Sequence, residues 1–220
     1  MRRGIIFDVD GTLWDSGPQV TQAWNEVLSQ YPQVNRQITT EEMYRYMGHT
    51  MDELGRMMLP KVDAELRTRI MNQCMEYENE YLADHPGTLY PGVREVLENL
   101  SKNWELYIVS NCQTGYIEVL LSSCHLGQWI RDIECYGRTG KPKGENIRFL
   151  MERNGLEDAF YVGDTAMDEE ACRIAAIPFI HAAYGFGRAN APAATITALC
   201  ELSGAAETLW ETYKKETETP

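Results

Sequence analysis

The sequence predicts an α/β fold, a doubly wound parallel sheet that carries a helical insert after its first strand. Short apolar runs that end in polar or turn residues recur along the chain, and amphipathic stretches separate them. This alternation is typical of parallel strands joined by right-handed helical crossovers. It is interrupted once, over residues 16–85, where one helical pattern follows another with no strand pattern between them.

Four apolar runs predict the strands of this Rossmann-like sheet. Each is short, rich in β-branched or aromatic residues, and suited to burial on both faces of a sheet. The predicted strands cover Gly4–Asp10, Trp104–Asn111, Ala159–Thr165 and Ile177–Gly185.

Between these runs, apolar residues return with helical spacing. The stretch Pro91–Asn99 and the residue that follows it place four aliphatic side chains on one face, and Asn154-Gly155 is a helix-ending signal. A last amphipathic helix is expected near the C-terminus. The predicted helices outside the insert cover Pro91–Asn99, Thr114–Ser123, Glu145–Arg153 and Thr195–Tyr213.

The insert begins with a helix start at Ser16, where Ser16 and Gln19 fit a capping box and Pro18 lies in the first turn. Thr50 and Glu53 fit a second capping box.

Two further helices are expected in the insert. Gly48 is expected to end a helix that begins near Thr40, and a long helix is expected over Asp63–Ala83. The turn-rich segment His85–Gly92 predicts the return to the sheet. We therefore expect a core domain of residues 1–15 and 86–220, and an α-helical domain of residues 16–85.

Composition excludes several classes of partner. The net charge of −13 argues against nucleic acid, because phosphate backbones are bound by clustered Lys and Arg. No run reaches the ~20 apolar residues of a membrane span, and the N-terminal run is too short for a signal peptide. Six scattered cysteines with no CxxC pair indicate reduced thiols, and hence a cytoplasmic protein.

Acidic side chains follow the predicted strands where ligands bind in an open parallel sheet. Asp8 and Asp10 end the first strand, Ser110 and Asn111 the second, and Asp164 the third, with Asp168 just beyond. Converging carboxylates and a hydroxyl suit Mg²⁺, which prefers oxygen ligands and also binds substrate phosphate. A turn or N-cap role is the alternative for Asp8 and Asp10, and a first-turn helix acid is the alternative for Asp168.

The motifs DVDGTL, VSN, GKPKGENI and VGDTAMD occur in the order and spacing typical of the haloacid dehalogenase-like hydrolase superfamily, which the chain resembles over essentially its whole length. The helical insert looks like the small α-helical cap of that superfamily. The segment DGTLWDS is closest to the branch that contains phosphoglycolate phosphatases and β-phosphoglucomutase.

This resemblance implies a role for each acid. Asp8 matches the nucleophile, which forms an aspartyl-phosphate, and Asp10 matches the general acid and base. Mg²⁺ would bind Asp8, the backbone carbonyl of Asp10, and Asp164. Asp168 would orient the metal-bound waters or the lysine.

The phosphoryl oxygens would be held by Thr12, Ser110 and Asn111. A lysine of the third motif would contact Asp8 and the phosphate, and two lysines compete for this role. Spacing to Asn154-Gly155 favours Lys141, whereas the start of the following helix favours Lys143, which we slightly prefer.

In the insert, His49, Arg45 and Arg56 are candidate contacts to substrate, although we favour an ordinary surface or core position for each.

The resemblance implies a Mg²⁺-dependent phosphatase that acts on a small phosphomonoester, such as a phosphoglycolate-like compound or a sugar phosphate. A β-phosphoglucomutase-like mutase and a non-catalytic binder of phosphorylated ligands are the alternatives. A haloacid dehalogenase is disfavoured because those enzymes lack the acid that Asp10 supplies.

Overall fold

The computed structural model describes the backbone of residues 3–217 and the side chains of residues 3–212. Its main sheet has six strands in the order β5-β4-β1-β6-β7-β8, and every neighbouring pair is parallel. This confirms the predicted α/β fold class. The strands are β1 (Arg3–Phe7), β4 (Glu105–Ser110), β5 (Ile130–Cys135), β6 (Asp158–Gly163), β7 (Phe179–Ala182) and β8 (Ala194–Ile196).

The first strand lies in the middle of the sheet, between β4 and β6. Successive side chains of a strand point to opposite faces. Ile5 and Phe7 accordingly belong to one hydrophobic cluster and Ile6 to another, and all three are fully buried. Burial on both faces explains why β1 reads as an unbroken apolar run.

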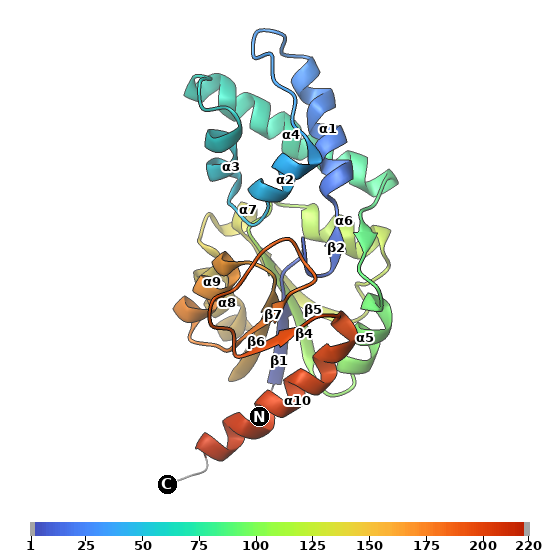
Figure 1. Cartoon of the computed structure of the whole chain (residues 1–220), viewed down its shortest axis with the longest axis vertical. Helices are drawn as coiled ribbons and strands as arrows, with labels where there is room; N and C mark the ends of the chain where they lie inside the picture. Colours follow the sequence, from blue (N-terminus) through green and yellow to red (C-terminus); the bar gives the residue numbers. More distant parts are fainter. Residues whose placement is uncertain (1–2, 218–220) are drawn as a thin grey trace.

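Helices cover both faces of the sheet (Figure 1). One face is covered by α8 and α9, which pack on β4, β5, β6 and β7. The other face is covered by α5 and α10, which contact β4, β8 and each other. The helices of this core are α5 (Val93–Leu100), α6 (Tyr116–Ser123), α7 (Tyr136–Thr139), α8 (Lys143–Asn154), α9 (Ala166–Ala175), η1 (Leu199–Glu201) and α10 (Leu202–Thr217).

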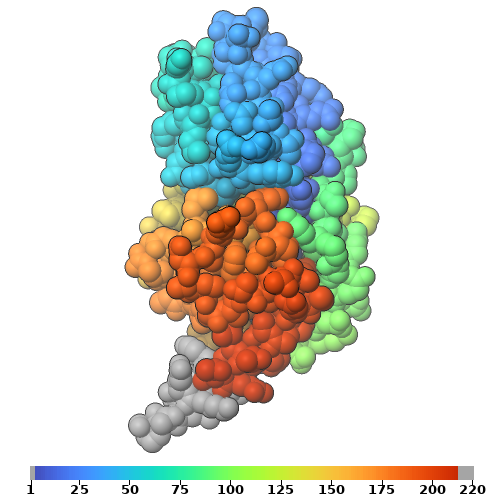
Figure 2. Space-filling view, in the orientation of Figure 1, coloured from blue at the N-terminus to red at the C-terminus, as the bar shows by residue number. Residues whose placement is uncertain are grey.

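The helical insert forms a compact group at one end of the core (Figures 1 and 2). A two-stranded antiparallel ladder joins the chain entering the insert to the chain leaving it, with Asp15 paired to Thr88. A tyrosine of the insert, Tyr44, stacks on Phe186 of the core at 4.5 Å between ring centroids. The elements are β2 (Trp14–Asp15), α1 (Gly17–Ser29), α2 (Thr40–Tyr46), α3 (Met51–Met58), α4 (Ala64–Asp84) and β3 (Thr88–Leu89).

Two strands of the main sheet, β5 and β8, were not predicted because their sequences do not look like buried strands, and the short β2 and β3 outside that sheet were not predicted either. The segment IRDIEC of β5 carries three charged residues, and β8 has only three residues; both lie at sheet edges. The expected helix over Thr195–Tyr213 is therefore wrong at its start, since α10 begins at Leu202.

The two predicted capping boxes had different outcomes. Thr50 and Glu53 form theirs, and Gly48 lies just past α2 with φ of +87°. The box expected at Ser16 does not form, because the Ser16 hydroxyl donates to Asp10 Oδ1 at 2.7 Å instead.

Within residues 3–217, no helix is both long and apolar enough to cross a bilayer. All six cysteines are free, and Cys200 is the exposed one.

Truncation of a central strand residue tests this architecture. Ile108 of β4 is fully buried, so Ile108→Ala is expected to lower the free energy of unfolding by about 2–5 kcal/mol. Met57→Ala, at a side chain that is 42% exposed, is the control and should change it by less than about 0.5 kcal/mol. Urea-induced unfolding measures both, and equal effects would contradict the assigned core.

Candidate active site

A tight turn after β1 positions the first two acids. Asp8 extends the pairing of β1 with β6 by one hydrogen bond, because its N–H donates to the Val162 carbonyl at 2.8 Å. The chain then folds back, and the Val9 carbonyl accepts bonds from the N–H groups of Thr12 and Leu13. Gly11 has φ of +78°, and a Cβ there would lie 2.3 Å from Asp164 Oδ2. Only glycine fits this turn.

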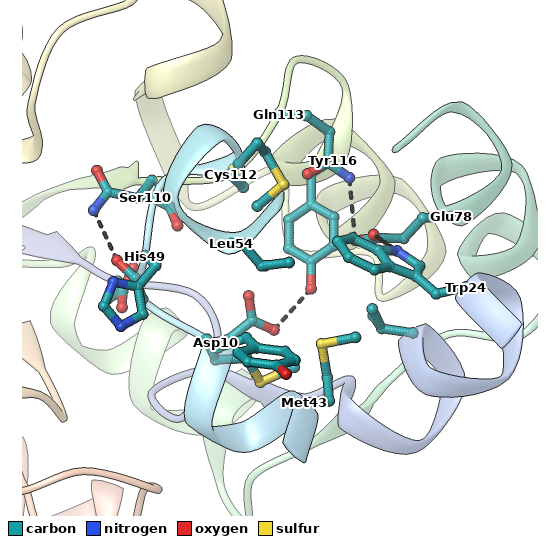
Figure 3. A pocket seen from close by; sticks show the side chains of 17 residues that line it. Asp10, Trp24, Met43, His49, Leu54, Glu78, Ser110, Cys112, Gln113 and Tyr116 are labelled. Atoms are coloured by element: carbon teal, nitrogen blue, oxygen red, sulfur yellow. Dashed lines mark hydrogen bonds between the residues drawn. The ribbon is translucent and has the colours of Figure 1, made fainter. Parts of the chain in front are cut away.

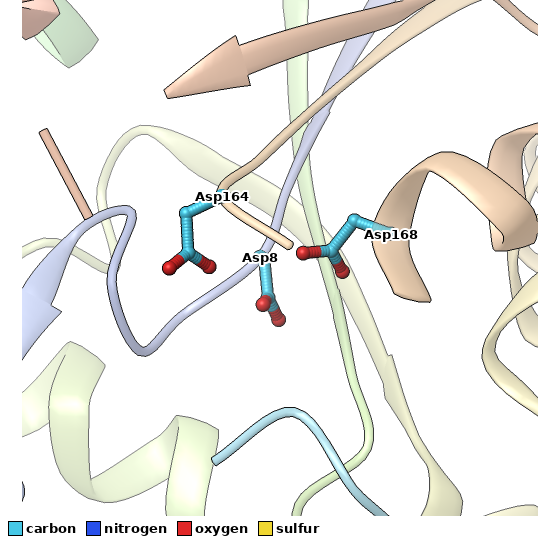
Figure 4. A group of neighbouring side chains, drawn as sticks. All are labelled: Asp8, Asp164 and Asp168. Carbon is cyan, nitrogen blue, oxygen red and sulfur yellow. The ribbon is translucent and has the colours of Figure 1, made fainter. Parts of the chain in front are cut away.

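Three aspartates meet beside this turn, two from the neighbouring ends of β1 and β6 and one from the first turn of α9 (Figure 4). One carboxylate oxygen from each of Asp8, Asp164 and Asp168 lies within 4.8 Å of those of the other two. Their exposed fractions are only 3%, 0% and 0%. Carboxylates packed this closely away from water repel one another unless a cation or protons neutralise them.

Lys143 supplies one of the missing positive charges. Its Nζ lies 3.0 Å from Asp8 Oδ1 and 2.5 Å from Asp168 Oδ1, and the side chain is 3% exposed. Burial lowers the pKa of Lys143, but the charges of Asp168 and Asp8 outweigh this and raise it overall, so the lysine stays charged. Lys141 is exposed, and no ion pair of its side chain is found among the described residues.

Backbone groups hold Asp164 in place. Its Oδ2 accepts the N–H groups of Phe186 at 2.7 Å and Gly187 at 3.1 Å, whereas its buried Oδ1 has no hydrogen-bond partner in the described structure. A Cβ at Gly185 would lie 2.4 Å from the Asp164 Cβ, so glycine is needed for this close approach. One oxygen of Asp164 is thereby fixed and the other is left for a ligand.

The residues present fit Mg²⁺. The site holds one lysine charge for three acids. Burial raises the pKa of Asp8 to about 7. Burial, together with the charges of Asp168 and Asp8, raises the pKa of Asp164 to about 8. A dication relieves this repulsion, and Mg²⁺ takes carboxylate oxygens together with waters. Asp8 and Asp164 would bind it directly.

Asp168 has a helix-capping role as well as its contact with the lysine. Its Oδ2 accepts the Thr165 N–H at 3.0 Å and the Thr165 hydroxyl at 2.7 Å, which completes a capping box for α9. The remaining oxygen, Oδ1, faces Lys143. The contact with Lys143 and the first-turn helix role of Asp168 therefore use different oxygens of one carboxylate.

Asp10 lies in the pocket with its carboxylate directed at the Tyr116 hydroxyl (Figure 3). Its Oδ1 accepts hydrogen bonds from Ser16 Oγ and Tyr116 Oη, both at 2.7 Å, and from Trp14 Nε1 at 3.0 Å. Burial raises the pKa of Asp10, although these three donors act in the opposite direction. Burial in the pocket therefore favours the protonated form of this carboxyl group.

The expected phosphate-binding residues lie around Asp8. The Thr12 hydroxyl is buried with no hydrogen-bond partner in the described structure, and Ser110 ends β4 with 6% exposure. Asn111 donates its amide N–H to the Gly48 carbonyl of the insert at 2.8 Å. This bond links Asn111 to the insert and uses one of the two N–H donors of its amide.

A pocket connects Asp8 to the helices of the insert and encloses about 470 Å³, part of it open to solvent. Arg45 and Arg56 are exposed and do not line it, which matches the favoured surface position. His49 does line it (Figure 3). The lining residues are Asp8, Asp10, Val20, Trp24, Met43, Tyr46, Met47, Gly48, His49, Met51, Leu54, Glu78, Ser110, Asn111, Cys112, Gln113 and Tyr116.

The sequence did not single out Glu78, Gln113 or Tyr116 as site residues. A signal for Glu78 was present, since it follows Ile70 and Cys74 at four-residue spacing on the buried stripe of α4. An acid in such a stripe indicates a buried carboxylate. Tyr116 and Gln113 carry no comparable signal, because α6 and the loop before it are brought to the pocket by tertiary packing alone.

The chain is similar in sequence to one protein family and to several known proteins. Residues 5–182 match the family model described as haloacid dehalogenase-like hydrolase. The phosphoglycolate phosphatase of Pseudomonas savastanoi pv. phaseolicola is 31% identical over 196 residues, which cover 83% of this chain and 70% of that protein. That of Shigella boydii serotype 4 is 25% identical over 218 residues, covering 86% and 84%.

Solved structures share the fold. A predicted phosphoglycolate phosphatase from Haemophilus somnus superposes with a TM-score of 0.81 at 21% identity, covering 93% of this chain and 98% of that one. CbbY from Rhodobacter sphaeroides in complex with phosphate gives 0.78 at 18% identity, covering 92% and 96%.

The clustered acids predict a stability that depends on both pH and Mg²⁺. A carboxyl group whose folded-state pKa is raised above the unfolded value, near 4, stabilises the fold at low pH and loses this contribution as pH rises through the folded pKa. For Asp8 and Asp164 this loss falls between about pH 4 and 8. Saturating Mg²⁺ should therefore raise the melting temperature by roughly 5–10 °C at pH 8. The rise at pH 5.5 should be smaller.

The matched variant is Asp164→Asn, which keeps an oxygen for Phe186 and Gly187 but removes the charge. It should lose the Mg²⁺-dependent rise, whereas Glu157→Gln at an exposed position should keep it. Thermal unfolding with and without EDTA measures the effect, and an equal Mg²⁺ response in Asp164→Asn would contradict the assigned site.

Proposed function

Since the chain belongs to the haloacid dehalogenase-like hydrolase family, we propose that it is a Mg²⁺-dependent phosphatase that cleaves a small phosphomonoester through an aspartyl-phosphate on Asp8. Family membership makes the chain a hydrolytic enzyme. The observation that carries the finer proposal is the pairing of Asp8 with Lys143 beside the unpartnered Oδ1 of Asp164. The names of the relatives, phosphoglycolate phosphatases, support the same reaction class.

In the first step, a carboxylate oxygen of Asp8 attacks phosphorus. The new Asp8 O–P bond forms as the bond from phosphorus to the substrate oxygen breaks, and Asp10 gives its proton to that leaving oxygen. The raised pKa of Asp10 supports this role, because the acid must be protonated when substrate binds. Its donors all end on Oδ1, which leaves Oδ2 for the transferred proton.

In the second step, Asp10 takes a proton from water. The water oxygen attacks phosphorus, the Asp8 O–P bond breaks, and inorganic phosphate leaves with Asp8 restored. Lys143 holds Asp8 in position throughout, and Asp168 holds Lys143. Thr12 and Ser110 would bind the phosphoryl oxygens, and Asn111 would link that end of the site to the insert.

When bound, Mg²⁺ supplies positive charge that lets an anionic nucleophile approach an anionic phosphate. Asp8, Asp164 and the Asp10 backbone carbonyl would hold it. A role for Asp168 in orienting its waters is also part of this proposal.

We assign residues 16–85 as the cap domain and residues 1–15 and 86–220 as the core. The ladder that pairs Asp15 with Thr88 supports this division, because it holds together the segment that enters the insert and the segment that leaves it. The pocket is lined from both parts, so substrate would be enclosed between them. A cytoplasmic location, expected from the free cysteines, belongs to the same proposal.

Substitution of the two acids tests the mechanism. Asp8→Asn should reduce hydrolysis of 4-nitrophenyl phosphate to background, and Asp10→Asn should reduce it by about 10²- to 10⁴-fold. EDTA should abolish wild-type activity and added Mg²⁺ should restore it. Activity that persists in Asp8→Asn would refute the mechanism, and a sugar phosphate converted to its isomer without release of phosphate would instead identify a mutase.

The lysine assignment has its own test. Lys143→Ala leaves Asp8 and Asp168 without their buried cation, so it should lower kcat by at least about 100-fold and destabilise the fold by about 3–5 kcal/mol at pH 8. Lys141→Ala should change neither by a measurable amount. Steady-state kinetics and urea unfolding decide, and equal small losses in both variants would contradict the assignment.

A further inference from the structure

The pocket holds a buried acid for which the mechanism has no use. Glu78 of α4 is 4% exposed and lines the pocket together with Asp10. Its carboxylate accepts hydrogen bonds from Trp24 Nε1 and, at 3.1 Å, from Gln113 Nε2 (Figure 3). Both donors are neutral, and no ion pair to Glu78 is found within the described part of the chain. A carboxylate buried in this way is stabilised by an arriving cation.

An unsatisfied hydrogen-bond acceptor lies beside Glu78. The Gln113 amide nitrogen faces two acceptors, Glu78 Oε1 at 3.1 Å and Asn79 Oδ1 at 3.2 Å, which fixes the orientation of the amide. The Gln113 oxygen is therefore turned away from them. It is buried and has no hydrogen-bond partner among the described residues. The pocket wall thus contains a buried carboxyl group with no cationic partner and an amide oxygen with no donor.

No strong cation balances these acceptors. None of the residues that line the pocket is Lys or Arg, and its one basic side chain is His49, which lies near Glu53 with 3.8 Å between Nδ1 and Oε2. Asp8 has Lys143, and the proposed Mg²⁺ and phosphoryl group belong to that end of the site. A substrate carboxylate placed near Glu78 would find no Lys or Arg among the lining residues to pair with it.

The rest of this wall suits a cation with an apolar stem. Trp24 and Tyr116 present buried rings, and Met43 and Leu54 add apolar surface. Aromatic faces attract cations, and an ammonium carries three donors and no acceptor, which matches a wall of acceptors.

We propose that the substrate is a phosphomonoester of a short amino alcohol, whose ammonium group is held by the Glu78 carboxylate and the Gln113 amide oxygen. This inference rests on the proposed phosphatase function and names the substrate class for that site. Burial raises the pKa of Glu78 to about 8, and a bound ammonium would return the group to its ionised form. Glu78 would therefore recognise the leaving group and take no part in bond cleavage.

The test compares phosphomonoesters that differ only at the far end. The two-carbon set is 2-aminoethyl phosphate, 2-hydroxyethyl phosphate and 2-phosphoglycolate, and the three-carbon set carries the same ammonium, hydroxyl and carboxylate ends. In at least one set, kcat/KM for the ammonium ester should exceed that for the hydroxyl ester by about 10- to 100-fold. The carboxylate ester should be the poorest substrate.

Glu78→Gln keeps the shape of the side chain and removes its charge, so it should lower the ammonium-to-hydroxyl ratio by about 10-fold or more. Glu80→Gln, at an exposed position on the same helix, is the control and should leave the ratio unchanged. The ratio is measured within one enzyme preparation, so a smaller folded fraction in a variant cancels from it.

Each outcome has one meaning. A wild-type enzyme that prefers the carboxylate or hydroxyl ester overturns this inference, and so does a Glu78→Gln ratio equal to that of wild type. In either case continued hydrolysis of 4-nitrophenyl phosphate leaves the phosphatase function standing. If no phosphomonoester is hydrolysed, the proposed function itself fails and the substrate class fails with it.

Discussion

The structure depends on a concentration of negative charge that one lysine only partly neutralises. One carboxylate oxygen from each of Asp8, Asp164 and Asp168 lies within 4.8 Å of the other two in a buried site, and Lys143 contacts two of these residues. Such a cluster is unfavourable without a further cation, since removing a charged group from water costs several kcal/mol. The features that make it unfavourable to the empty fold are those that suit it to a dication and a phosphoryl group.

Sheet topology explains how the chain tolerates this cluster. β1 is central, so Asp8 emerges between the ends of β4 and β6, and Ser110 and Asp164 lie at those ends. Glycines at 11 and 185 let the backbone close on Asp164, whose Oδ2 is fixed by two N–H groups. The acids are thus held by the best-buried part of the sheet, where packing supplies the stability that their repulsion removes.

The parts of this architecture that were predictable carry strong local signals. β1 and the helical insert were predictable because apolar runs, turn residues and capping boxes reflect short-range physics. β5 was not, because its charged residues suit an edge strand, where one side faces solvent. The choice between Lys141 and Lys143 needed tertiary structure. Lys141 lies just before α8 and Lys143 begins it, and only the packing of α8 on the core decides which lysine is buried. The same holds for Tyr116, which reaches Asp10 across 106 positions of sequence.

Phe186 connects the insert to the proposed metal site. Its backbone N–H fixes Asp164 Oδ2, and its ring stacks on Tyr44, whose hydroxyl donates to Asp15 at 2.9 Å at the base of the insert. Asn111, next to Ser110, binds the Gly48 carbonyl on the other side of the pocket. These two contacts between the insert and the core are each adjacent, in sequence or by hydrogen bond, to a residue of the acid site. The packing of the insert on the core and the geometry of the acids therefore share these contacts.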